Sequence, residues 1–198
     1  MADDRSTAAF VPVHGLHHFA WRCRDAEETR RFYEDLLGLP LAHLIEVDHV
    51  PSTGEYCPYV HLFFEMTDGS FIAFFDLGDD VASDPSPNTP SWVNHLALRV
   101  QTPEQVREAK ARLEAAGIDV VGVTDHGFIQ SIYFFDPNGI RLELTTQPGE
   151  TPRTPAARQA VRARLDAWTA RKNDLRESGA IKPSQQRIIR SHSDPAYR

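Results

Sequence analysis

The chain carries the same pattern of hydrophobic and polar residues twice, and this duplication constrains its fold more than any other feature. Each copy opens with an alternating run that contains a histidine, continues into an amphipathic stretch, and closes with apolar runs joined by a tight turn. The copies span about residues 14–76 and 92–147. Alternation predicts strands and a 3.6-residue period predicts a helix, so each copy is predicted to be a β-α-β-β-β module.

Capping signals fix the helix of each module. Asp25 and Thr102 each precede an amphipathic stretch and have a Glu or Gln three residues later, which is the capping-box pattern. Gly38 and Gly117 are predicted to end the two helices at equivalent points. The segment 77–91 is rich in Asp, Pro and Ser and is predicted to link the modules.

Charge divides the chain into an acidic body and a basic tail. Residues 1–150 carry 24 acidic and 10 basic residues, a net charge of −14, and residues 151–198 carry 4 acidic and 11 basic, a net charge of +7. A helix is predicted at about 155–177. The tail has few aromatic residues to stack on bases, so we expect it to lie on its own acidic body or on that of a second subunit, not on nucleic acid.

The remaining composition indicates a soluble protein with an α+β fold. The 198 residues include two widely spaced cysteines, Cys23 and Cys57, with no CxxC pattern, so a reducing compartment is expected. No run is apolar enough to cross a membrane, and the chain opens without an apolar leader, so we expect a cytoplasmic protein with no membrane partner. The predicted domains are residues 1–150 and a helical or extended tail over 151–198.

Two such modules, with a histidine on the first strand and a glutamate on the last, resemble the vicinal oxygen chelate superfamily. That superfamily includes glyoxalase I, the bleomycin and fosfomycin resistance proteins, methylmalonyl-CoA epimerase and the extradiol ring-cleaving dioxygenases. The resemblance covers residues 14–147 and implies eight strands forming a cup around one metal ion.

Strand alternation identifies the residues that would hold this ion. Aligning HFAW with HLAL makes His18 and His95 equivalent, and His17 is then predicted to point the other way. Glu143 on the last strand of the second module corresponds to Ala73 in the first. The predicted ligands are therefore His18, His95 and Glu143, with the fourth position empty. Two imidazoles and one carboxylate suit a non-haem Fe(II) that binds a chelating substrate and O2, and the same ligands also suit Mn(II) or Zn(II).

The stretch TDHGFIQSIYFFDPNGIRLEL is similar to the ring-cleavage signature of the extradiol branch. The matching positions are Thr124, His126, Ile132, Tyr133, Asp136, Pro137, Gly139 and Glu143. The resemblance implies a one-domain type I extradiol dioxygenase that cleaves a catechol-like ring with O2 and serves aromatic hydrocarbon catabolism. It also implies that His126 hydrogen-bonds the substrate hydroxyl or the departing oxygens, and that Tyr133 orients or protonates the ring oxygen.

Larger extradiol enzymes carry a further active-site histidine near the last hairpin of the first module, and residues 68–70 contain none. His61 has the parity of Phe63, so it is predicted either to face the cup as a catalytic replacement or to be a strand-edge histidine. His49 is a second candidate at the mouth. An apolar cup that suits an aromatic ring is predicted from Phe63, Phe74, Phe128 and Phe135.

Several other activities of the superfamily remain alternatives. A metal-dependent lyase or isomerase would need no O2. Glyoxalase I and the epimerase use a further ligand at the position of Ala73, which argues against them. A fosfomycin-type thiol transferase binds a phosphonate dianion, but residues 1–150 contain only one lysine, Lys110, while Arg22, Arg99 and Arg141 leave this alternative open. The intact ligand set argues against a metal-free binding protein. We expect a homodimer or a larger homo-oligomer.

Overall fold

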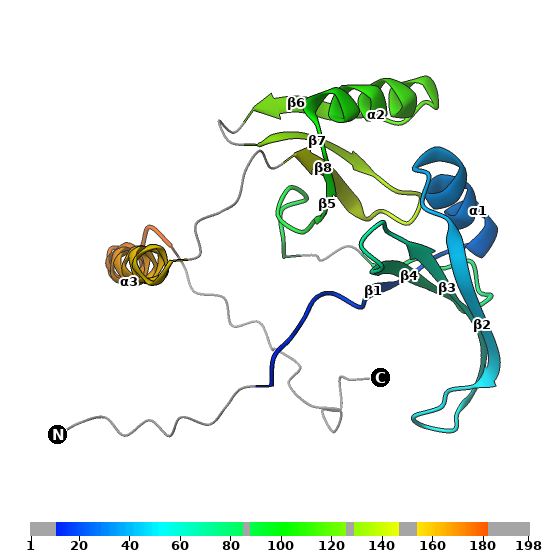
Figure 1. Ribbon diagram of the computed structural model, residues 1–198. Coiled ribbons are helices and arrows are strands. Elements are labelled where there is room, and N and C mark those ends of the chain that lie inside the picture. Colours follow the sequence, from blue (N-terminus) through cyan, green and yellow to red (C-terminus); the bar gives the residue numbers. More distant parts are fainter. Residues whose placement is uncertain (1–10, 85–87, 126–128, 147–153, 182–198) are drawn as a thin grey trace. The chain divides into compact units, whose positions relative to one another are not determined.

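The computed structural model describes residues 11–84, 88–125, 129–146 and 154–181. The chain forms two compact units, one ending at Pro148 and the other beginning at Gly149. The first unit contains both modules, and the second contains the helix α3 (Pro155–Glu177) (Figure 1). Within the described ranges, no helix is long and apolar enough to cross a membrane.

Both predicted β-α-β-β-β modules are present, and each builds its own four-stranded sheet (Figure 1). The elements of the first module are β1 (His18–Arg22), α1 (Ala26–Arg30), η1 (Arg31–Leu36), β2 (Leu41–His49), β3 (Tyr56–Glu65) and β4 (Phe71–Asp76). Those of the second are β5 (Leu96–Val100), α2 (Pro103–Ala115), β6 (Val121–Asp125), β7 (Gln130–Phe135) and β8 (Arg141–Thr146). The strand orders are β1-β4-β3-β2 and β5-β8-β7-β6, so β1 and β5 are equivalent edge strands.

The capping residues act as predicted. The Asp25 carboxylate accepts the backbone N–H of Glu28 at 2.6 Å, and Thr102 forms a reciprocal capping box with Gln105. Gly117 follows α2 with a φ of +83°, a conformation that glycine adopts without steric cost. Short local signals therefore set where both helices begin and where α2 ends.

One continuous core lies between the helices and the sheets. Tyr33 on η1 is fully buried, with its ring 5.3 Å from Phe64 and 5.0 Å from Phe74. Phe32, on the same turn, contacts Phe134 of the second module with ring centroids 6.3 Å apart. The prediction that Phe74 lines the cup is wrong, because alternation along β4 turns Phe74 toward the helix and Ala73 toward the opposite face.

A buried polar joint connects the modules at the DPNG turn. The Tyr33 hydroxyl donates to Asp136 Oδ2 at 2.9 Å, and the other carboxylate oxygen accepts the N–H groups of Asn138 at 2.9 Å and Ile140 at 2.7 Å. Asn138 Oδ1 in turn accepts the N–H of Arg24 at 3.0 Å. Burial raises the pKa of Asp136 above its ordinary value. The DPNG turn, which belongs to the stretch that resembles the ring-cleavage signature, thus joins the two modules through Asp136 and Asn138.

Candidate metal and substrate site

Three side chains of the second module meet on one face of its sheet. Glu143 on β8 lies opposite Tyr133 on β7, and His95 immediately precedes β5. His95 Nε2 lies 3.0 Å from Glu143 Oε2, and the Tyr133 hydroxyl donates to Glu143 Oε1 at 3.2 Å. Only 5% of Glu143 is exposed, so its carboxylate is held away from water. Tyr133 thus lies on the same face of the sheet as Glu143, the side on which the sequence placed it.

The hydrogen bonds of His95 make its inner nitrogen a suitable metal ligand. Nδ1 lies 2.9 Å from the carbonyl oxygen of Val93, which can only accept, so Nδ1 carries the proton. In a neutral ring Nε2 then presents a lone pair toward the carboxylate of Glu143. Two electron-rich groups at 3.0 Å need a proton or a cation between them. A histidine that donates its outer N–H to a carbonyl is also the usual arrangement at metal centres.

Tyr133 is held as a neutral donor beside this pair. Burial, followed by the negative charge of Glu143, raises the pKa of the phenol above its ordinary value. The guanidinium carbon of Arg141 lies 4.2 Å from the centre of the Tyr133 ring, and Arg141 Nη1 donates to the carbonyl of Trp92 at 2.8 Å. Arg141 therefore packs against the tyrosine and fixes the ring in place.

The third predicted ligand, His18, belongs to an aromatic cluster on the sheet of the first module. Its ring centroid lies 5.6 Å from that of Phe63 and 6.0 Å from that of His61. The Nδ1 atoms of His17 and His18 are 2.7 Å apart. The prediction that His17 points away is wrong, because His17 precedes β1 and strand alternation does not control it. His43 also contacts Phe63, at 6.3 Å.

His61 faces the cup side of its sheet, as its parity predicted. Its ring stacks on Phe75 at 3.7 Å and contacts Phe63 at 4.1 Å. Burial, and then the charge of His18, lowers the pKa of His61 to about 4. Its buried Nε2 has no hydrogen-bond partner within the described part of the chain. His61 is thus a neutral imidazole with an unsatisfied nitrogen beside a predicted ligand.

One chain does not bring the three ligands together. Among the described residues, no group of three or more His, Cys, Asp or Glu side chains could hold a metal ion. His95 and Glu143 meet on the second sheet, whereas His18 stands with His61 on the first. Two of the three predicted ligands, His95 and Glu143, therefore lie together, and His18 lies apart from them. His126 lies outside the described residues.

His49 does not join either group. It lies at the end of β2, where its ring contacts Tyr56 at 5.3 Å. Phe63 faces the cup, Phe135 is half exposed at 49%, and Phe128 lies outside the described residues. The first sheet instead supplies Phe71 and Phe75, which the sequence prediction missed although they share the parity of Ala73.

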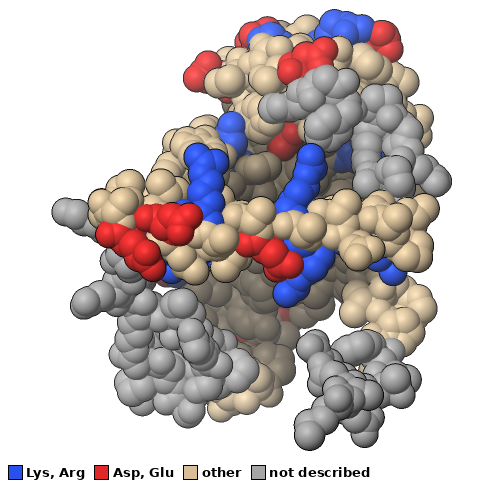
Figure 2. Space-filling model, turned by 90° about the vertical axis from the view of Figure 1, so that its left-hand side faces the viewer, with Lys and Arg blue, Asp and Glu red and all other residues tan. Residues whose placement is uncertain are grey.

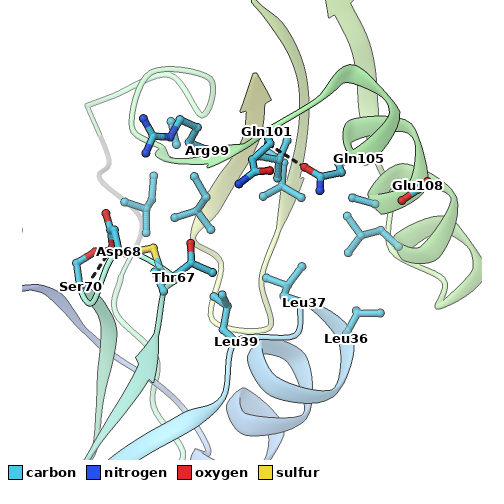
Figure 3. Close-up of a pocket in the computed structure, with 18 of the residues that line it drawn as sticks. Leu36, Leu37, Leu39, Thr67, Asp68, Ser70, Arg99, Gln101, Gln105 and Glu108 are labelled. Atoms are coloured by element: carbon cyan, nitrogen blue, oxygen red, sulfur yellow. Dashed lines mark hydrogen bonds between the residues drawn. The ribbon is translucent and has the colours of Figure 1, made fainter. Parts of the chain in front are cut away.

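Two clefts lie between the modules. The larger, of about 1030 Å³, separates β5 and α2 from the end of η1 and the β3–β4 turn (Figure 3). Its apolar wall includes Leu36, Leu37 and Leu39, and its polar side chains include Asp68 and Arg99. None of the predicted site residues that the structure describes lines it. It borders the free edge of β5, whose strand partner is β8.

The smaller cleft, of about 630 Å³, contains predicted chemistry. His95 and Arg141 line it together with Phe19, Trp21 and Phe135. The rings of Phe19 and Trp21 stack at 5.4 Å with 17° between their planes. Three aromatic side chains, one imidazole and one guanidinium therefore form part of a mixed wall that also contains Asp84, and the volume of the cleft falls within the range of small-molecule sites. Of the two clefts, the smaller is the one that a predicted ligand, His95, lines.

Comparison with known proteins gives the family. Residues 15–144 match the Glyoxalase family model, which describes the Glyoxalase/Bleomycin resistance protein/Dioxygenase superfamily. The chain belongs to this superfamily. A search of curated proteins finds no match.

Similar solved structures include a glyoxalase/dioxygenase from Nostoc punctiforme, with 25% identity, a TM-score of 0.51, and coverage of 69% of this chain and 92% of that one. A glyoxalase family protein from Enterococcus faecalis has 26% identity, a TM-score of 0.50, and coverage of 67% and 97%. The fosfomycin resistance protein FosX from Listeria monocytogenes, solved with Mn(II) and sulfate, has 20% identity, a TM-score of 0.50, and coverage of 69% and 95%. This last likeness concerns the fold alone. The choice among the reactions of the superfamily therefore depends on the site.

Proposed function

We propose that the chain is a metal-dependent oxygenase that cleaves a catechol-like ring with O2, loaded with Fe(II) and built from two copies of the chain. The observation that carries the proposal is the His95–Glu143–Tyr133 cluster, whose His95 lines a cleft together with Phe19, Trp21 and Phe135. His95, Glu143 and His18 would hold the ion. When bound, Fe(II) supplies the chelation of two vicinal oxygens and the activation of O2.

The residues around the ion have separable duties in this proposal. Tyr133, a neutral phenol, donates a hydrogen bond and is placed to orient or protonate a ring oxygen. His61, with its buried Nε2 unsatisfied, would accept a hydrogen bond from a substrate hydroxyl and pass a proton between that hydroxyl and oxygen. The Phe19–Trp21 pair and Phe135 exclude water from one side of the ring.

The charge around the cleft favours a neutral aromatic substrate over a phosphonate. Arg22 is paired with Asp79, and Arg99 lines the larger cleft. Arg141, which lines the smaller cleft, is already bonded to the carbonyl of Trp92 and packs on Tyr133. A dianion would need several cations with free N–H groups. The thiol-transfer alternative is therefore the weaker one.

A second copy is proposed as the source of the missing ligand. β1, which carries His18, and β5, which His95 precedes, are both sheet edges with one strand partner each. Trp21 on β1 is 38% exposed, and the larger cleft borders β5. Exposed edges and apolar walls of this kind are covered in stable proteins. Pairing two copies would cover them and would place His18 of one copy beside Glu143 of the other.

The reaction is tested by loading the protein with Fe(II) under anaerobic conditions and adding O2 with a panel of catechols. We expect O2 consumption together with a yellow ring-fission product. Zn(II)-loaded protein is the control and should consume no O2. Turnover of a diol or of another substrate without O2 uptake would replace the proposal with an isomerase or lyase.

The shared site is tested by mixing two inactive variants, His18→Ala and Glu143→Gln. In a dimer with sites between copies, each mixed dimer contains one site with all three ligands, so a 1:1 mixture after subunit exchange should regain about a quarter of the wild-type activity. If the site lies within one chain, the mixture stays as inactive as either variant alone, and the shared site is wrong.

His61→Phe is expected to lower kcat by about 100-fold, because it removes the proton-transferring nitrogen and keeps a ring between Phe63 and Phe75. Its melting temperature should remain that of the wild type or rise slightly. The matched control is His49→Phe, which changes a histidine away from the cluster and should leave kcat unchanged. Equal loss in both variants would argue against a specific role for His61.

A further inference from the structure

The helix α3 has an apolar stripe, none of whose residues is buried. Val161, Leu165, Trp168 and Leu175 are separated by four, three and seven residues, so they share one face. Val161 is 66% exposed, Leu165 52% and Trp168 47%, and α3 contains no buried residue. A helix of 23 residues gains most of its stability from packing such a face. The stripe therefore needs a partner.

The charges of α3 are sorted around this stripe. At 100° per residue, basic side chains border it on both sides, and acidic side chains lie on the opposite face. The bordering residues are Arg158, Arg162 and Arg176 on one side and Arg164 and Arg171 on the other, whereas the opposite face carries Asp166, Asp174 and Glu177. Figure 2, turned so that α3 faces the viewer, shows Lys and Arg side chains standing out along it. Of the basic side chains of α3, only Arg162 forms an ion pair with a described residue, Asp166.

These charges exclude a second α3 as the partner. In a paired helix the basic borders of one copy would face those of the other, and like charges at such positions oppose association. Lys172 would also stand within the seam. The partner surface must instead combine exposed apolar side chains with unpaired acidic ones.

The β2–β3 hairpin of the first unit carries both. Leu44 is 52% exposed, Ile45 48% and Tyr56 70%. Glu46, Asp48 and Glu55 are exposed on the same hairpin, where Glu46 shares its face of β2 with Leu44 and Ile45 lies on the opposite face. Among the described residues, none of these three carboxylates is in an ion pair, whereas the exposed acids of α1 and α2 pair with neighbouring arginines and lysine. Figure 1 shows β2 at the edge of its sheet, with the hairpin projecting beyond it.

We propose that α3 of one copy docks on the acidic β2–β3 hairpin of a second copy. The stripe from Val161 to Leu175 is about 21 Å long and β2 is about 30 Å long, so the two surfaces match in extent. The basic borders then lie against Glu46, Asp48 and Glu55. The choice of a second copy as the partner rests on the proposed shared site, whereas the complementarity of the surfaces does not.

The test uses full-length protein with a photo-crosslinking amino acid, p-benzoylphenylalanine, in place of Trp168. Copies labelled with 14N and 15N are mixed, irradiated without iron or substrate, and analysed by mass spectrometry. We expect cross-links to the segment 41–65 that join one isotope to the other. Arg158→Glu/Arg164→Glu/Arg171→Glu and Glu46→Lys/Asp48→Lys/Glu55→Lys should each lower the yield about tenfold, and the two sets together should restore it.

The control Glu104→Lys/Glu114→Lys/Asp119→Lys makes the same change in net charge away from the hairpin and should leave the yield unchanged. Cross-links within one isotope only, or to other segments, would overturn the proposal. So would binding of the full chain to anionic vesicles or to DNA that competes with the cross-link. The readout needs no catalysis, so a failed dioxygenase assay leaves this result standing, and a lost cross-link leaves the dioxygenase result standing.

Discussion

Replacing Glu143 with Gln is expected to lower kcat/KM by about 10³-fold, because the change removes a charged ligand while keeping its size and its hydrogen bond from Tyr133. The carboxylate is buried against His95 with 3.0 Å between Nε2 and Oε2. An amide in its place presents one weak oxygen to the ion. Iron content after anaerobic loading, measured together with O2 uptake, should fall in parallel with activity.

Two controls define this result. Glu65→Gln changes an exposed carboxylate at the end of β3 and should alter neither iron content nor activity. Circular dichroism should show that Glu143→Gln remains folded, because the amide keeps the size of the side chain and an acceptor for the Tyr133 hydroxyl, so that no cavity is created. Full activity in the variant would mean that Glu143 is not a ligand, and the proposed metal centre would then be abandoned.

Replacing Asp136 with Ala is expected to lower the free energy of unfolding by about 3 kcal/mol and the melting temperature by roughly 6–12 °C. The change leaves the Tyr33 hydroxyl and the N–H groups of Asn138 and Ile140 buried without acceptors. Thermal and urea unfolding monitored by circular dichroism would measure both quantities.

Tyr33→Phe provides the graded comparison. It removes one donor and leaves Asp136 with its two backbone partners, so the loss should be about 1 kcal/mol. Asp119→Ala, at an exposed position, should change little. The hydrogen bonds indicate that the polar joint stabilises the fold. If Asp136→Ala proved as stable as the wild type, this conclusion would be wrong.

The local signals were sufficient to predict the modules. Asp25 and Thr102 cap their helices, and the TDG and DPNG turns join the last two strands of each module, because these features depend on a few neighbouring residues. Strand parity likewise placed Tyr133 and His61 on the correct faces. It failed for His17, which lies just outside β1, and for Phe74, where one register step exchanges the two faces of a strand.

Long-range arrangement was beyond the sequence patterns. Equivalence in a repeat gives His18 and His95 the same place in each module, but it does not say whether the two modules of one chain face each other. That relation depends on the core formed by Phe32, Tyr33 and Phe134, which no periodic pattern encodes. The structural duty of Asp136 was missed for the same reason, since its partner Tyr33 lies 103 residues away.

The polar joint at the DPNG turn also has a consequence for how the molecule comes apart. η1 of the first module packs against strands of both modules. Separating the modules would therefore expose the ring of Phe134 and leave the carboxylate of Asp136 without the hydroxyl of Tyr33. Calorimetry should accordingly record a single unfolding transition for the two modules. Hydrogen-exchange rates of the backbone amides in α2 and in η1 should change together under destabilising conditions.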